Sequence, residues 1–144
     1  MVIPLPPHSP QMKDTKRNSQ KGKSGLKRIK NAFFYSLSGI VSAWRDEEAF
    51  RQIAICATLG IIVSFFLARS WIELVALLLP CFFALCSELI NSAIENAIDF
   101  TSLEIHPLAK KAKDMGSAVQ LLACIFWVIV WGSYLVDRFL HPIY

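Results

Sequence analysis

Three long apolar runs alternate with short polar segments along the chain. A bilayer core about 30 Å thick is crossed by roughly 20 helical residues, and each run reaches that length once its flanking residues are included. The pattern therefore predicts an all-α membrane protein with three transmembrane helices. We place these helices at about residues 50–68, 71–98 and 117–136.

A fourth helix, amphipathic rather than apolar, is predicted ahead of these runs, over residues 25–46. Its apolar residues recur at spacings of three and four, and basic residues crowd its first turns. A basic amphipathic helix typically lies in the membrane interface, although a soluble core helix is the alternative. The apolar positions are Leu26, Ile29, Phe33, Leu37, Ile40, Val41 and Trp44.

The segment before this helix, residues 1–24, is rich in proline, lysine and arginine. Such a composition buries too little apolar surface to fold, so we expect a disordered basic extension. Residues 25–144 then form a single membrane domain.

A polar stripe follows the second apolar run. Glu88, Asn91, Ser92, Glu95 and Asp99 fall within a sector about 100° wide when they are plotted on a helix. Ionisable groups are costly in hydrocarbon and usually face a bundle interior or a water-filled site. The stripe is therefore a candidate functional site, and the alternative is a set of hydrogen bonds that hold helices together.

The depth of each stripe residue follows from the helical rise. A span that starts near Ile72 leaves the hydrocarbon near Asn91, at about 1.5 Å per residue. Glu88 then lies at the edge of the lipid layer, whereas Glu95 and Asp99 project into water. A helix of this kind crosses the boundary between a lipid substrate in the bilayer and a soluble substrate in the water.

Basic residues set the expected topology. Of 15 lysines and arginines, 13 lie either before Gln52 or in the segment Lys110–Lys113. Since positive charge is retained in the cytoplasm, we expect a cytoplasmic N-terminus, a cytoplasmic second loop over residues 100–116 and a periplasmic C-terminus. The net charge of +4, concentrated in a basic N-terminal region, suggests a membrane surface or a polyanionic partner such as ATP or nucleic acid. No nucleic-acid-binding motif is present, so nucleic acid is not an expected partner.

The acidic residues suggest chemistry at this cytoplasmic face. Mg²⁺ takes hard oxygen ligands, typically one or two carboxylates with phosphates and waters, and Glu47 and Glu95 are the best candidates. Glu48, beside Glu47, leaves open which of the two binds metal. Lys113 could offset phosphate charge, and Glu88 could accept a proton from a lipid hydroxyl.

Three segments carry a family resemblance. They are Ala49-Phe50-Arg51-Gln52, Glu88-Leu89-Ile90-Asn91-Ser92-Ala93-Ile94-Glu95 and Ala112-Lys113-Asp114-Met115-Gly116-Ser117-Ala118. Over about residues 25–136 the chain resembles the bacterial integral-membrane diacylglycerol kinases. A sibling branch phosphorylates undecaprenol, but the first and third segments look more like the diacylglycerol branch. A non-catalytic membrane scaffold or small transporter is the remoter alternative.

The resemblance implies a homotrimeric helical bundle in the inner membrane, with active sites shared between neighbouring chains. It implies transfer of the γ-phosphoryl group of MgATP to diacylglycerol, which gives phosphatidic acid. By motif, Glu88 matches the general base, and Asn91, Lys113 and Asp114 match further catalytic positions. Glu47 and Glu95 match the metal ligands. The implied ATP contacts are Arg28, Tyr35, Glu47, Glu95, Glu104, His106, Lys113 and Asp114, and the implied lipid-substrate contacts are Glu88, Ser117, Trp44 and Arg51.

Overall fold

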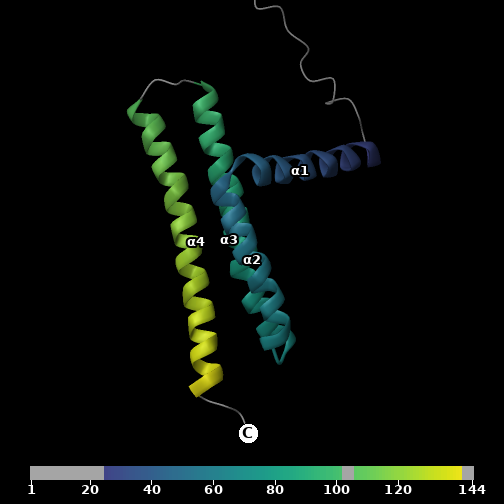
Figure 1. Ribbon diagram of the computed structural model, residues 1–144. Coiled ribbons are helices and arrows are strands. Elements are labelled where there is room, and N and C mark those ends of the chain that lie inside the picture. Colours follow the sequence, from purple (N-terminus) through teal and green to yellow (C-terminus); the bar gives the residue numbers. More distant parts are fainter. Residues whose placement is uncertain (1–24, 102–105, 141–144) are drawn as a thin grey trace, which may run out of the picture. The chain divides into compact units, whose positions relative to one another are not determined.

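The computed structural model describes residues 25–101 and 106–140 of the chain (Figure 1). The expected extension over residues 1–24 and the expected ATP contact Glu104 lie outside the described residues. The described part is helical and contains no strand, as the sequence predicts. Its four helices are α1 (Leu26–Asp46), α2 (Glu48–Leu67), α3 (Trp71–Thr101) and α4 (Pro107–Leu140).

The chain divides into two compact units, one up to Ser36 and one from Leu37 onward. Within the first unit, Gly25 has a φ of 73° and starts α1. This left-handed conformation costs glycine least. The apolar residues Leu26, Ile29 and Phe33 are exposed there, as an interfacial helix requires.

Three helices of the second unit, α2, α3 and α4, are long and apolar enough to cross a membrane. The predicted membrane architecture is confirmed at this level. Large apolar side chains such as Phe66, Phe82 and Val128 are exposed on their surfaces. In water such surfaces would be unfavourable, but hydrocarbon accommodates them.

α3 packs against both α2 and α4 (Figure 1). Small residues allow the close approach, because a Cβ added to Gly60 would lie only 2.9 Å from the Trp127 ring and 3.0 Å from the Cys81 sulfur. Ala57 and Ala84 are also buried in this packing. Small residues at helix contacts are typical of membrane bundles, where close packing replaces the hydrophobic driving force.

The turn between α2 and α3 is held by side chains from both sides, and we call this region the turn end. The Tyr134 hydroxyl lies 2.7 Å from the Leu67 carbonyl oxygen and 3.0 Å from a Glu73 carboxylate oxygen. The Glu73 carboxylate also accepts the Arg69 backbone N–H at 2.9 Å. Ser70 caps the start of α3 by accepting the Glu73 N–H at 3.2 Å.

The prediction of a loop over residues 100–116 was wrong in its second half, because α4 begins at Pro107. Proline suits the first helical position, where its missing N–H costs nothing. His106 caps the helix: its Nδ1 accepts the Leu108 N–H at 3.2 Å, and its carbonyl accepts the Lys110 N–H at 3.0 Å. The first turns of α4 thus extend the expected third span toward its N-terminus.

Candidate functional site

Polar side chains gather at the other end of the bundle, which we call the site end. It comprises residues 87–99 of α3, the junction of α1 and α2 at residues 42–47, and the first turns of α4. All of these residues belong to the second unit. The site end contains the predicted polar stripe.

The two flanks of the stripe face different helices. Leu89, Ser92 and Asn96 face the α1–α2 junction, where they line a pocket. On the opposite flank Ser87 and Asn91 contact α4. The acidic residues lie between these two flanks, where Glu88 is buried, Glu95 is half-buried and Asp99 is exposed.

Glu88 is the most buried of the site-end acids, with only 3% of its surface exposed. Glu95 and Glu47 are close enough to act on its charge. Among the described residues, none donates a hydrogen bond to the Glu88 carboxylate. A buried acid without a partner is costly to fold, so its presence points to a functional role.

The flank toward α4 is tightly fitted. Ser87 donates a short hydrogen bond to Gln120. The Asn91 amide donates to Glu95 at 3.3 Å, while its buried Oδ1 has no hydrogen-bond partner among the described residues. A Cβ added to Gly116 would lie 2.5 Å from this Oδ1, so only glycine leaves room for the asparagine.

The structure distinguishes Glu47 from Glu48. Glu47 lies at the N-cap position of α2, is half-buried, and accepts the Asn96 amide N–H at 2.6 Å. Glu48 is exposed and is contacted by Gln52 of its own helix at 3.4 Å. Glu47 therefore belongs to the site end, and Glu48 belongs to the outer surface of α2.

The charged residues of α4 form ion pairs. The Lys113 ammonium lies 2.6 Å from Asp99 of α3. Asp114 pairs with Lys110 of its own helix at 2.7 Å, and both side chains are largely exposed. Asp99, a stripe residue with no role assigned from sequence, thus ties α4 to α3 through Lys113.

Two of the expected lipid contacts meet at the α1–α2 junction. Arg51 donates to the backbone carbonyls of Trp44 and Arg45, at 3.2 and 3.0 Å. These bonds satisfy carbonyls at the C-terminal end of α1, where a cation is favourable. Trp44 itself is 49% exposed, and Ser117 is an exposed residue of α4.

Three further expected ATP contacts are not tested by the geometry of the site end. His106 is exposed and has the capping role described above. Arg28 and Tyr35 belong to the unit that ends at Ser36. The roles of all three stay predictions.

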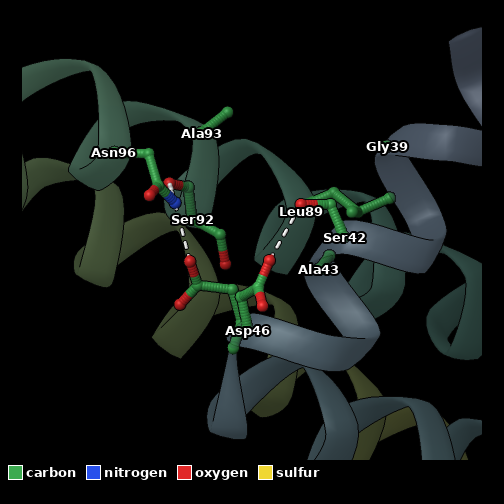
Figure 2. A pocket seen from close by; sticks show the side chains of 9 residues that line it. Gly39, Ser42, Ala43, Asp46, Leu89, Ser92, Ala93 and Asn96 are labelled. Atoms are coloured by element: carbon green, nitrogen blue, oxygen red, sulfur yellow. Dashed lines mark hydrogen bonds between the residues drawn. The ribbon is translucent and has the colours of Figure 1, made fainter. Parts of the chain in front are cut away.

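Sequence reasoning missed the pocket, which has a volume of about 340 Å³ (Figure 2). Its polar lining comes from Ser42, Asp46 and Glu47 on one side and from Ser92 and Asn96 on the other. Asn96 was overlooked because it lies about 80° around the helix from Glu88, outside the stripe. The signal available in the sequence was a polar residue next to the stripe.

Asp46, on the pocket wall, carries a paired negative charge. It is hydrogen-bonded to the Arg45 guanidinium at 2.9 Å and to the Ser42 hydroxyl at 3.1 Å. These two hydrogen bonds, with Arg45 the stronger influence, lower the pKa of the Asp46 carboxyl. Asp46 therefore stays ionised at neutral pH, next to Glu47.

No group of three or more histidine, cysteine or acidic side chains within residues 25–101 and 106–140 is arranged to hold a metal ion. Mg²⁺ needs no such group, because one or two carboxylates suffice when phosphates and water complete its shell. The donors at the site end fit this chemistry. Glu47 and Glu95 each have one carboxylate oxygen held by an asparagine amide, and the Asn91 oxygen is unpaired.

Comparison with known proteins gives a consistent result. The family model described as prokaryotic diacylglycerol kinase matches residues 34–135. A diacylglycerol kinase of Helicobacter pylori (strain ATCC 700392 / 26695) is 53% identical over 116 residues, which cover 81% of this chain and 91% of the relative. The Pseudomonas aeruginosa diacylglycerol kinase is 47% identical, covering 81% and 94%. That of Escherichia coli (strain K12) is 38% identical, covering 81% and 95%.

Proposed function

Because the chain belongs to the prokaryotic diacylglycerol kinase family, we propose that it transfers the γ-phosphoryl group of ATP to the free hydroxyl of diacylglycerol. The products are phosphatidic acid and ADP. The chain is a multi-pass membrane enzyme whose described part has three helices long and apolar enough to span the bilayer, so its lipid substrate reaches it within the bilayer.

The surroundings of Glu88 are the observation that supports the proposal most directly. Its carboxylate is buried, receives no hydrogen bond from the described residues, and lies where the apolar part of α3 gives way to polar residues. In the reaction, Glu88 accepts the proton of the lipid hydroxyl. The hydroxyl oxygen then bonds to the γ-phosphorus while the bond from that phosphorus to the ADP oxygen breaks.

Glu47 and Glu95 would hold Mg²⁺, which neutralises phosphate charge when it is bound. Each keeps one carboxylate oxygen beyond the one that an asparagine amide occupies. Asn91 orients Glu95, and Lys113 and Asp114 face the nucleotide in our proposal. The pair between Lys113 and Asp99 keeps the lysine near the site until phosphate competes for it.

The other assigned contacts surround this centre. For the nucleotide we retain Arg28, Tyr35, Glu104 and His106. For the lipid we retain Ser117, Trp44 and Arg51 beside Glu88, and the Arg51 hydrogen bonds to the end of α1 make its effect on lipid indirect.

The assembly is proposed to be a homotrimer in the inner membrane, with the N-terminus cytoplasmic and the C-terminus periplasmic. The distribution of basic residues supports this orientation. The small bundle supports the oligomer, because one chain buries few residues and can hardly enclose ATP and a lipid together.

The test is transfer of labelled phosphate from ATP into extracted lipid by the purified protein in mixed micelles. Diacylglycerol is expected to be labelled in a Mg²⁺-dependent reaction. Preferential labelling of undecaprenol would instead assign the chain to the sibling activity. Labelling of neither lipid would favour a scaffold or transporter.

A further inference from the structure

Asn96 occupies a position that the family motif leaves unassigned, and it touches one of the two proposed metal ligands. Its amide nitrogen lies 2.6 Å from Oε1 of Glu47 and 2.8 Å from the Ser92 carbonyl oxygen. Figure 2 shows the side chain of Asn96 turned toward the α1–α2 junction across the pocket. Since both neighbours of the nitrogen are acceptors, only the NH₂ group can occupy this position.

The Asn96 amide is therefore fixed in orientation. One N–H donates to the backbone of its own helix and the other to Glu47, so neither hydrogen is left over. The bond to Glu47 is charge-assisted, and such bonds are shorter and stronger than neutral ones. It joins α3 to the start of α2, two elements that are 49 residues apart at this contact.

The Glu47 backbone is held independently of this bond. Its N–H donates to the Ala43 carbonyl at 2.9 Å, and its carbonyl accepts the Arg51 N–H at 3.3 Å. The side chain makes no capping hydrogen bond to α2. Asn96 is thus the contact that orients the carboxylate, and it leaves Oε2 available to a ligand.

A similar contact holds the other proposed ligand, because the Asn91 amide donates to Oε1 of Glu95 at 3.3 Å. Two asparagines of α3 each hold one acid, on opposite flanks of the stripe. Fixed second-shell donors of this kind set the geometry and affinity of a metal site.

We infer that Asn96 is a positioning residue for the metal-binding carboxylate of Glu47, and that it raises the affinity of the site for the divalent cation of the nucleotide. The inference rests on the proposed function. In this role Asn96 acts through Glu47 and is not itself a proposed ligand of the metal.

The experiment compares Asn96→Ala with Thr101→Ala in the full-length protein. Thr101 is a matched control, because its hydroxyl also donates to a carbonyl of α3 four residues back, at 2.7 Å, without touching Glu47. The first readout is binding of Mn²⁺, as a spectroscopic substitute for Mg²⁺, measured by electron paramagnetic resonance in the presence of a non-hydrolysable ATP analogue. The second is the Mg²⁺ concentration that gives half-maximal phosphate transfer.

Asn96→Ala is expected to weaken Mn²⁺ binding and to raise the half-maximal Mg²⁺ concentration by about tenfold to a hundredfold, the usual effect of losing an outer-shell partner of a metal ligand. Activity at saturating Mg²⁺ should be close to that of the wild type. Thr101→Ala should change neither readout.

A double variant tests the route of the effect. In a Glu47→Gln background, Asn96→Ala should cause little further loss of Mn²⁺ binding, because the two residues act through one contact. Wild-type Mn²⁺ binding by Asn96→Ala, or equal losses in Asn96→Ala and Thr101→Ala, would overturn the inference. Failure of the wild type to phosphorylate diacylglycerol would instead overturn the proposed function. The comparison of Mn²⁺ binding would still test whether Asn96 affects the metal site.

Discussion

The turn end and the site end each include a glutamate of α3, but the surroundings of the two glutamates differ. At the turn end, Glu73 accepts the Arg69 N–H and lies within hydrogen-bonding distance of the Tyr134 hydroxyl. At the site end, Glu88 is 3% exposed and receives no hydrogen bond from the described residues. Polar groups at the turn end are thus committed to the fold, whereas Glu88 has no hydrogen-bond partner among the described residues, which agrees with the proposed role of Glu88 at the lipid hydroxyl.

This difference has an energetic consequence. A hydrogen-bonded carboxylate that closes a turn adds to stability, while a buried carboxylate without a partner subtracts from it. Removing the charge should therefore act in opposite directions at the two ends. Active sites often retain such unfavourable groups, because activity needs them where stability does not.

The largest expected effect comes from Glu88→Gln. The substitution keeps the shape of the side chain but removes the proton acceptor, so phosphate transfer to diacylglycerol should fall by about 10²- to 10⁴-fold. Thermal unfolding in micelles should be unchanged or slightly more difficult. The measurements are labelled phosphate transfer and a melting curve on the same preparation.

Glu73→Gln is the matched control at the turn end. It should leave phosphate transfer nearly intact and lower the melting temperature, because the charge-assisted bonds to Arg69 and Tyr134 weaken. Equal losses of activity in both variants would remove the distinction between the two ends. So would a Glu88→Gln protein that retains wild-type turnover.

Two glycines give the next largest effect. A Cβ at Gly116 meets the Asn91 side chain at 2.5 Å, and a Cβ at Gly60 meets Trp127 at 2.9 Å. Each alanine variant should be destabilised by about 1–3 kcal/mol through overpacking. Gly116→Ala should also reduce activity, since Asn91 holds Glu95, whereas Gly60→Ala should lose stability without a specific loss of turnover.

Gly132→Ala on α4 serves as the control, because nothing lies within 4 Å of its added Cβ. An alanine there should stabilise the helix by about 0.5–1 kcal/mol. Chemical unfolding and phosphate transfer are measured for all three variants. If Gly116→Ala behaved like Gly132→Ala, the close contact between α3 and α4 at Asn91 would be disproved.

Helical periodicity was enough to predict the spans and the stripe from Glu88 to Asp99, because one helix carries the whole pattern. It missed Asn96, whose importance depends on Glu47, a residue 49 positions away at this contact. Contacts between distant elements leave no periodic signal. The start of α4 could have been predicted from the local sequence, since Pro107 is typical of a first helical position. The surrounding polar residues favoured a loop instead.

Tyr134→Phe should have a smaller effect, confined to the turn end. The change removes the hydroxyl that lies 2.7 Å from the Leu67 carbonyl and also contacts Glu73. The expected loss of stability is about 0.5–1.5 kcal/mol, with phosphate transfer unchanged. Equilibrium unfolding measures the first and labelled phosphate transfer the second. A loss of turnover larger than the loss of folded protein would mean that the turn end also serves the reaction.

The smallest expected effect concerns the pH dependence of Asp46 at the site end. Hydrogen bonds from Arg45 and then Ser42 lower the pKa of its carboxyl in the folded protein. The stabilising contribution of the ionised Asp46 should therefore be complete above the unfolded pKa, about 3.9, and be lost as the pH falls through the lower folded pKa.

The melting temperature of Asp46→Asn should be slightly below that of the wild type at pH 7 and equal to it at strongly acidic pH. Ser42→Ala should show a weaker form of the same behaviour. A difference that grows toward acidic pH would contradict the pairing. Both Asp46 and Arg45 are well exposed, so solvent keeps the effect small. A charge at the site end can thus be paired and structural while Glu88 has no hydrogen-bond partner among the described residues, so the contrast between the two ends concerns Glu88 and Glu73 and not every charge.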